Sequence, residues 1–321
     1  EDLQPVRSYK IRGAYNLIAQ LDGAQRGAGV VCASAGNHGQ GVAFACARLG
    51  IRGRIFVPAT TPRQKRERIL ALGEGRVDLA VVGDTYDEAA AAARLEAGGT
   101  GAAIVPAFDD VRTIVGQGTV AREIVDQFGR APDVLVAPVG GGGMIAGCLA
   151  YLGERHPEVS VVGAEPAGAA SMAAALAAGE PVDLDQLDTF VDGAAVRRIG
   201  DLTFEVARRY RPELYPVPEG RICSEMLALY QTEGIVTEPA GALAAASLGL
   251  YRPEPGQDVV VIVSGGNNDV SRYAEILERS LVYEGRKHYF LVNFPQEPGA
   301  LRRFLDEVLG PDDDITHFEY V

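Results

Sequence analysis

The sequence predicts an α/β protein built from two doubly wound parallel-sheet domains. Short runs rich in Val and Ile alternate with longer Ala-rich segments, which is the rhythm of strand and helix in a parallel sheet. The alternation occurs in two series, one before and one after about residue 115. Hydrophobic residues make up 47% of the 321-residue chain, which is enough for two or three domains with sizeable cores.

The first series is expected to form the smaller α/β subdomain, at about residues 24–115. The expected strands are 30–34, 54–58, 77–83 and 102–106. The expected helices are 39–49, 62–72 and 86–96. Because the strands are short and almost wholly apolar, we expect helices on both faces of their sheet.

The second series is expected to form the larger subdomain. Its expected strands are 134–139, 160–165 and 258–264. Its expected helices are 119–128, 145–154, 169–178, 202–210, 222–232 and 240–248. Ligands of such sheets bind beyond the carboxyl ends of the strands, so we expect the site there or between the two sheets.

The pattern changes near residue 287. A strand at 288–294, a helix at 298–309 and a strand at 315–321 are expected, after a breaker-rich join at 296–299. This β-α-β order predicts part of a small α+β domain at 286–321.

Charge and composition exclude several classes of protein. A net charge of −13 argues against nucleic acid or an anionic membrane as the main partner. The longest apolar runs, such as 259–263, have the length of a strand, so no transmembrane helix is expected. The four cysteines form no C-x-x-C pair, which favours reduced thiols in a cytoplasmic core, and the four histidines show no zinc-binding spacing.

Lys10 is the first candidate for chemistry. The chain has three lysines, Lys10, Lys65 and Lys287, against 27 arginines. Arg cannot form a Schiff base, whereas a desolvated Lys amine can attack an aldehyde. Lys10 directly precedes an amphipathic run, so we expect its amine at the start of a helix. An ordinary surface lysine would fit the same pattern.

The segment 34–40, Ser-Ala-Gly-Asn-His-Gly-Gln, is a second candidate. It lies between an expected strand and helix, where exposed N–H groups can receive a carboxylate or phosphate. Asn37 adds an amide that can donate to a ring oxygen. A catalytic role for His38 is conceivable, but a structural histidine with a fixed tautomer is favoured. A tight turn without a ligand is the alternative for the whole segment.

Four consecutive glycines, 140–143, precede Met144 between another expected strand and helix. Glycine is costly in a helix, by roughly 0.5–1 kcal/mol each, and is tolerated where the backbone wraps closely around a ligand. Such a loop at a helix N-terminus is a cradle for an anion, most simply a phosphate. The dinucleotide pattern fails because Ile145 stands where a third glycine is required, and no P-loop Lys follows.

Two more segments carry polar residues at expected element ends. Ser264 ends a strong strand, where its hydroxyl could meet a heterocyclic nitrogen or cap a helix near Asp269. Glu238 precedes Pro239, which suits a first helical turn. For Glu238 we favour a structural role at the helix terminus over a binding role.

Taken in order, these segments resemble the fold-type II pyridoxal-phosphate enzymes, whose fold is like that of tryptophan synthase β. The resemblance rests on 8–13, 34–40, 140–144, 238–242 and 264–267, and extends over residues 1–280 as a catalytic region. The tail, with its run at 293–301, resembles the beginning of the ACT-like regulatory domain of the biosynthetic threonine dehydratases. The chain is therefore most similar to that family.

The resemblance implies pyridoxal 5'-phosphate as the cofactor. Lys10 would hold it covalently and act as the catalytic base, and Tyr9 would lie against its ring. Asn37 would bind the ring hydroxyl, and Ser264 the pyridine nitrogen. The phosphate would be bound by Gly140, Gly141, Gly142, Gly143 and Met144. The substrate carboxylate would be received by Ser34, Ala35, Gly36, Asn37 and His38.

The implied reaction converts L-threonine to 2-oxobutanoate and ammonia, the first step of isoleucine biosynthesis. Ala35 stands where similar serine racemases carry a Ser that delivers a proton, so we predict elimination with negligible racemisation. Glu165 and Ala169 match a cation site of some relatives, but Ser171 replaces its Asp, so no metal is expected. Serine dehydratase or racemase and 3-hydroxyaspartate ammonia-lyase remain alternatives.

The tail implies allosteric control by isoleucine, with valine as a second candidate effector. The family implies a homotetramer. Two other classes stay open on the residues alone: an NAD-dependent dehydrogenase, favoured by the sheet rhythm, and an amino-acid sensor that uses only the tail.

Overall fold

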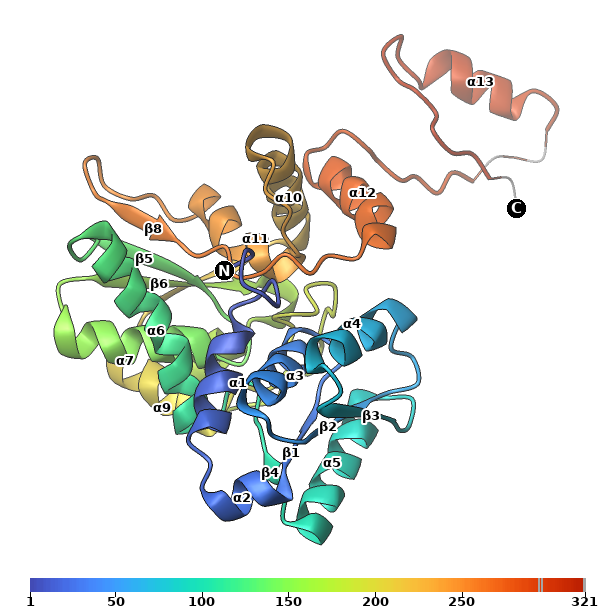
Figure 1. The fold of residues 1–321 in the computed structure, drawn as a ribbon. Coiled ribbons are helices and arrows are strands. Elements are labelled where there is room, and N and C mark those ends of the chain that lie inside the picture. Colours follow the sequence, from blue (N-terminus) through green and yellow to red (C-terminus); the bar gives the residue numbers. More distant parts are fainter. Residues whose placement is uncertain (294, 296, 320–321) are drawn as a thin grey trace.

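The computed structural model describes residues 1–293, 295 and 297–319, and its strands form two four-stranded sheets (Figure 1). The first sheet contains β1 (Val30–Ala33), β2 (Gly53–Val57), β3 (Val77–Val81) and β4 (Ala103–Ile104). The second sheet contains β5 (Val134–Pro138), β6 (Ser160–Pro166), β7 (Glu213–Val217) and β8 (Val259–Val261). All pairings within the two sheets are parallel, as predicted.

The two sheets share one strand order. It is β3-β2-β1-β4 in the first and β7-β6-β5-β8 in the second. In each sheet the chain moves outward from its first strand and then returns to that strand's other side. The reversal therefore lies at β1 and at β5, where ligands of open α/β sheets bind beyond the carboxyl ends of the strands.

Helices cover both faces of the first sheet, because its strand residues are apolar on both sides. Val30 and Cys32 pack with α1 (Lys10–Ala19) and α3 (Asn37–Leu49). Val31, which points to the other face, packs with α5 (Tyr86–Thr100). Two further helices of this half are α2 (Gly23–Ala28) and α4 (Arg63–Gly73).

The second sheet is covered in the same way. One face, around Leu135, packs with α6 (Val111–Phe128), α7 (Gly143–Arg155), α8 (Ser171–Ala178) and α9 (Asp201–Tyr210). The opposite face, around Val136, packs with α11 (Pro239–Ala246). Beyond α11 lie α10 (Glu219–Glu233) and α12 (Tyr273–Tyr283), which share a core cluster with it.

One strand was not predicted, and its sequence explains why. β7 reads Glu-Leu-Tyr-Pro-Val, and Pro216 argues against a strand because it cannot donate a backbone hydrogen bond. β7 lies at the edge of the second sheet, where one side needs no donor. The edge position accommodates Pro216.

The tail differs from the prediction. The expected helix is present as α13 (Ala300–Glu307), but residues 288–293 and 315–319 form no strand. Phe294, Tyr320 and Val321, where those strands were expected to end, lie outside the described residues. Tyr289 and Leu291 are 67% and 96% exposed, because no neighbouring strand pairs with them in the described part of the chain. Figure 1 shows α13 standing apart from both sheets.

Two further predictions concern membrane helices and cysteines. Among the described residues, no helix has the length and apolar character that crossing a membrane requires. Cys32, Cys46, Cys148 and Cys223 are all free and buried, on β1, α3, α7 and α10.

Candidate active site

Lys10 is the first residue of α1, as predicted. Its Nζ donates to the carbonyl of Ala107 at 3.1 Å and lies 5.2 Å from the centre of the Tyr9 ring. Lys65 and Lys287 each form an ion pair, with Asp192 at 3.3 Å and Glu278 at 2.6 Å. No carboxylate within the described ranges forms an ion pair with Lys10. Among the three lysines of the chain, Lys10 is thus the one whose amine forms no salt bridge with a described residue.

The start of α1 packs directly on α3. A methyl group on Gly41 of α3 would lie 3.1 Å from the carbonyl oxygen of Lys10 and 3.2 Å from the amide of Ile11. Glycine at this position allows the two backbones to approach closely, because a larger residue would have to push the start of α1 away. This contact places Lys10 beside the first turns of α3, which follow the loop 34–36.

A short backbone bridge brings Lys10 to the end of the second sheet. Ser8 pairs with Gly265 in an antiparallel bridge, and the Tyr9 amide donates to the Ser264 carbonyl at 3.1 Å. The Ser264 side chain is buried, and its hydroxyl donates to the Ala240 carbonyl at 3.1 Å. Ser264 therefore does not cap a helix; the turn near Asp269 is capped by Asp269 itself.

The loop after β1 ends at the N-terminus of α3. The Gly36 amide donates to the Ser34 hydroxyl at 3.2 Å, and no side chain caps the helix. The first N–H groups of α3 are therefore left without side-chain acceptors, as an anion site requires. A methyl group on Gly36 would meet no atom within 4 Å, so there is open space in front of this loop.

His38 matches the structural interpretation. It is buried, and its Nε2 donates to the Val105 carbonyl at 2.7 Å. Burial and, to a smaller extent, the charge of Lys10 lower the pKa of His38 to about 4. The ring is therefore neutral at pH 7 with its proton on Nε2. Its Nδ1 has no partner among the described residues and can accept a hydrogen bond from a ligand.

The tetraglycine loop after β5 is shaped by crowding. Gly142 stands at the N-cap of α7 with φ +88°, and a methyl group there would lie 2.6 Å from the Met172 side chain. Gly141 and Gly143 both pack against Phe108, which leaves no room for a Cβ. The next residue, Met144, is buried in α7. Backbone N–H groups therefore line this loop at the positive end of the α7 dipole.

Two neighbours hold the glycine loop in place. The Thr203 hydroxyl donates to the Gly141 carbonyl at 2.8 Å. Asp109 accepts from the amides of Asp201 and Leu202, at 3.1 and 2.9 Å, so it caps α9 and anchors the Phe108 segment. No pattern in the sequence had indicated Phe108, Asp109 or Thr203, because each acts through a contact distant along the chain.

Glu238 makes a contact that the sequence did not indicate. It occupies the N-cap position of α11, but its side chain makes no capping hydrogen bond. Its Oε1 instead accepts from Nδ2 of Asn37 at 2.6 Å. Asn37 also accepts from Nδ2 of Asn267 at 2.7 Å. Glu238 therefore stands at the helix terminus, as expected for a structural role, but its side chain reaches across to α3.

Glu165 has a local structural role. The carboxylate accepts from the amides of Met172 and Ala173 at 2.7 and 2.9 Å, so it caps α8. Burial raises the pKa of Glu165 to about 7. The described residues contain no group of three or more potential metal ligands.

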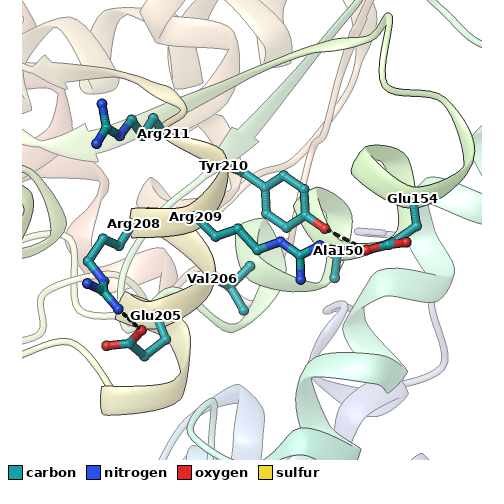
Figure 2. Close-up of a pocket in the computed structure, with 8 residues that line it drawn as sticks. All are labelled: Ala150, Glu154, Glu205, Val206, Arg208, Arg209, Tyr210 and Arg211. Atoms are coloured by element: carbon teal, nitrogen blue, oxygen red, sulfur yellow. Dashed lines mark hydrogen bonds and ion pairs between the residues drawn. The ribbon is translucent and has the colours of Figure 1, made fainter.

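An open groove along α7 and α9 is lined by none of the residues described above (Figure 2). It is lined by Ala150, Glu154, Glu205, Val206, Arg208, Arg209, Tyr210 and Arg211. Arg209 and Tyr210 both contact Glu154, and Arg208 pairs with Glu205. Because most of the charged side chains that line the groove are paired with one another, we do not regard the groove as the candidate active site.

Comparison with known proteins places the chain among described families. Residues 1–265 match the family model described as pyridoxal-phosphate dependent enzyme. Residues 278–321 match the C-terminal regulatory domain of threonine dehydratase.

Individual relatives agree with these matches. The chain is 62% identical to the biosynthetic L-threonine dehydratase IlvA of Mycobacterium tuberculosis, over all of this chain and 75% of the relative. It is 51% identical to the enzyme of that name from Bacillus subtilis, over all of this chain and 76% of the relative. A solved structure of processed threonine deaminase isoform 2 from Solanum lycopersicum superposes with a TM-score of 0.83 at 38% identity, covering 87% of this chain and 81% of that one. These matches confirm the predicted fold class, family and cofactor.

Proposed function

The chain belongs to the pyridoxal-phosphate dependent enzymes and, within them, to the biosynthetic threonine dehydratases, and we propose from that premise that it converts L-threonine to 2-oxobutanoate and ammonia. The observation that carries the proposal is the position of Lys10. Its amine has no carboxylate partner in the described part of the chain, and it donates to the carbonyl of Ala107. The next residue, Phe108, packs against the glycine loop after β5.

The residues present fit the cofactor. Its phosphate fits the glycine loop, where a side chain at Gly141 or Gly142 would be excluded. The hydroxyl of Ser264 and the amide of Asn37 offer polar contacts for the ring nitrogen and the ring oxygen. Tyr9 lies beside Lys10, where it can flank the ring. When bound, the cofactor supplies an electron sink next to the substrate Cα.

The chain's own residues then have separate tasks. The substrate carboxylate is received by the loop 34–38, at the N-terminus of α3. The amine of Lys10, once free, takes the proton from the substrate Cα and keeps it within the site. His38 stays neutral and can accept a hydrogen bond at Nδ1. Ala35 has no proton that it could give to the substrate Cα, whereas a Ser at this position could give one. The methyl group of Ala35 therefore favours loss of the β-hydroxyl over racemisation.

Labelling tests the site directly. Borohydride fixes the cofactor to the lysine that holds it, so reduction followed by digestion should yield one labelled peptide, containing Lys10. Lys10→Ala should lose the visible absorbance and at least about 10³-fold in turnover, because the base is removed. A label on Lys65 or Lys287 would refute the assignment.

Substrate preference is tested by comparison. L-Threonine, L-serine and 3-hydroxyaspartate are assayed side by side, and we expect the highest kcat/KM for L-threonine. A higher value for L-serine would favour the serine dehydratase or racemase alternative, and a higher value for 3-hydroxyaspartate the ammonia-lyase alternative. Failure to form 2-oxobutanoate would refute the proposal.

The domain proposals rest on the matched regions, and the assembly proposal rests on the family resemblance alone. Residues 1–280 act as the catalytic region, with 24–115 as its smaller subdomain, and 286–321 belong to an ACT-like regulatory domain that binds isoleucine or valine. We propose a cytoplasmic homotetramer. Isoleucine should lower threonine turnover in the full-length enzyme; turnover unchanged by isoleucine and valine would remove the regulatory part of the proposal.

A further inference from the structure

Glu238 is a buried carboxylate that joins the two halves of the molecule. It is 7% exposed and lies directly before α11 of the second sheet. Its hydrogen-bond partner, Asn37, is the first residue of α3, which covers the first sheet. The approach depends on Gly265, since a Cβ there would collide with Oε1 of Glu238.

The hydrogen bond from Asn37 to Glu238 is part of a short chain of amides. Asn267 donates from Nδ2 to the Val6 carbonyl and to Oδ1 of Asn37, both at 2.7 Å. Asn37 donates from Nδ2 to Glu238 at 2.6 Å. The chain of bonds thus begins at a backbone carbonyl and ends at a carboxylate.

While Glu238 is ionised, both ends of this chain can only accept hydrogen bonds. A carbonyl has no hydrogen to give, and an ionised carboxylate has none either. If the Asn37 amide were reversed, its oxygen would face the Glu238 oxygen, and its nitrogen would face the nitrogen of Asn267. Reversal would therefore replace two hydrogen bonds by two repulsive contacts. The orientation of Asn37 is determined from both sides.

This arrangement leaves Asn37 with one unused donor. Its oxygen and one N–H are engaged, and the second N–H has no acceptor among the described residues. An Asn amide without such partners could present either oxygen or nitrogen to a ligand. Here only an N–H is offered, and a phenolic oxygen needs a donor of that kind.

We propose that Glu238 is a positioning residue that fixes the Asn37 amide so that its single free N–H faces the ring oxygen of the cofactor. The inference rests on the proposed function and adds a residue that acts through Asn37 without contacting the cofactor. Asn267 serves the same purpose from the other end.

The surroundings of Glu238 act on its ionisation in both directions. Burial and the charge of Asp192 raise its pKa to about 7, although the Asn37 hydrogen bond, Lys65 and Lys10 favour the ionised form. A buried carboxylate is costly unless its hydrogen bonds repay desolvation. A Gln of the same shape would avoid that cost, but it could donate as well as accept and would let the Asn37 amide reverse.

Cofactor binding to the apo protein tests the idea. Apo forms of wild type, Glu238→Gln and Asn267→Ala are titrated with pyridoxal phosphate at a temperature well below each melting point. We expect both variants to raise the dissociation constant about tenfold or more and to shift the visible absorbance band and its pH midpoint. The matched control is Glu219→Gln, since Glu219 accepts from the Gly168 amide at 2.8 Å and lies outside the amide chain.

Each outcome decides the matter. Glu219→Gln should bind the cofactor within twofold of wild type with an unchanged spectrum. If Glu238→Gln also does so, even with a lower melting temperature, Glu238 is merely structural and the inference is wrong. If Glu238→Gln does not fold, Asn267→Ala carries the same prediction, and an unchanged dissociation constant there overturns it. If wild-type apo protein itself fails to bind pyridoxal phosphate, the proposed function fails instead.

Discussion

The loops after β1 and β5 occupy equivalent positions in their sheets but differ in the residues that form them. Both follow the central strand at which the chain reverses, and both lead into a helix N-terminus. The loop after β1 and the first turn of α3 carry Ser34, Asn37 and His38, whereas the loop after β5 consists of Val139 and glycines. A methyl group at Gly36 meets open space, whereas one at Gly142 meets Met172. One loop offers side chains to a ligand, and the other offers its backbone.

The difference follows from what each loop packs against. Phe108, Met172 and Thr203 pack closely against the glycine loop, and Thr203 also donates a hydrogen bond to it. These contacts restrict the backbone of the loop and the directions of its N–H groups. The loop after β1 is held by hydrogen bonds of its side chains, such as that of Asn37 with Glu238. Alanine substitutions should therefore affect the two loops differently.

Gly142→Ala should have the largest effect. Its φ of +88° disfavours alanine, and the methyl group would lie 2.6 Å from Met172. Strain and overpacking together amount to roughly 2–5 kcal/mol, so the dissociation constant for pyridoxal phosphate should rise on the order of 100-fold or more. Titration of the apo protein measures it. Gly98→Ala, at an uncrowded helical site, should leave binding unchanged; equal effects would remove the contrast between crowded and open positions.

Glu165→Gln should change how stability depends on pH. Because burial raises the pKa of Glu165 from 4.5 to about 7, its protonated form is favoured in the folded state. The stability it contributes is fully present below pH 4.5 and is lost as pH rises through 7, up to about 3 kcal/mol. The variant lacks this loss, so its unfolding free energy relative to wild type should increase between pH 4.5 and 7. Urea unfolding at several pH values measures the difference; a constant difference would contradict it.

Gly36→Ala should have a moderate and selective effect. Since nothing lies within 4 Å of the new methyl group, the fold and the cofactor site should be unaffected. The methyl group would occupy the space proposed for the substrate carboxylate, so KM for L-threonine should rise on the order of tenfold. Steady-state kinetics with saturated cofactor decide this. If the dissociation constant for pyridoxal phosphate rises and KM for L-threonine does not change, the open space belongs to the cofactor instead.

Ala35→Ser should have the smallest effect. The wild-type protein should release no detectable D-allothreonine from L-threonine, because a methyl group cannot return a proton to Cα. The variant should release a small amount while still forming mainly 2-oxobutanoate. Chiral chromatography of the reaction mixture measures both products, and D-allothreonine from the wild type would show that another residue supplies the proton.

The accuracy of the sequence predictions followed the range of the interactions involved. Lys10 at a helix start and glycines before α7 were predicted because residues adjacent in the chain encode them. Predictions failed where the outcome depends on partners distant along the chain. In the described part of the tail, residues 288–293 and 315–319 form no strand, and the edge strand β7, which contains Pro216, was not predicted. The role of Glu238 was also missed, since nothing near it in sequence indicates Asn37.

By itself, the sequence determined the two parallel sheets, the two strand-to-helix loops that begin α3 and α7, and Lys10 at the start of a helix, because hydrophobic periodicity and glycine conformation are local properties. The tertiary structure decided which groups meet: Ser264 beside Tyr9, Phe108 behind the glycine loop, and Glu238 on Asn37. Those contacts depend on how the two halves of the molecule pack together, for example through α1, which contacts both α3 and α6, and no local pattern specifies that packing.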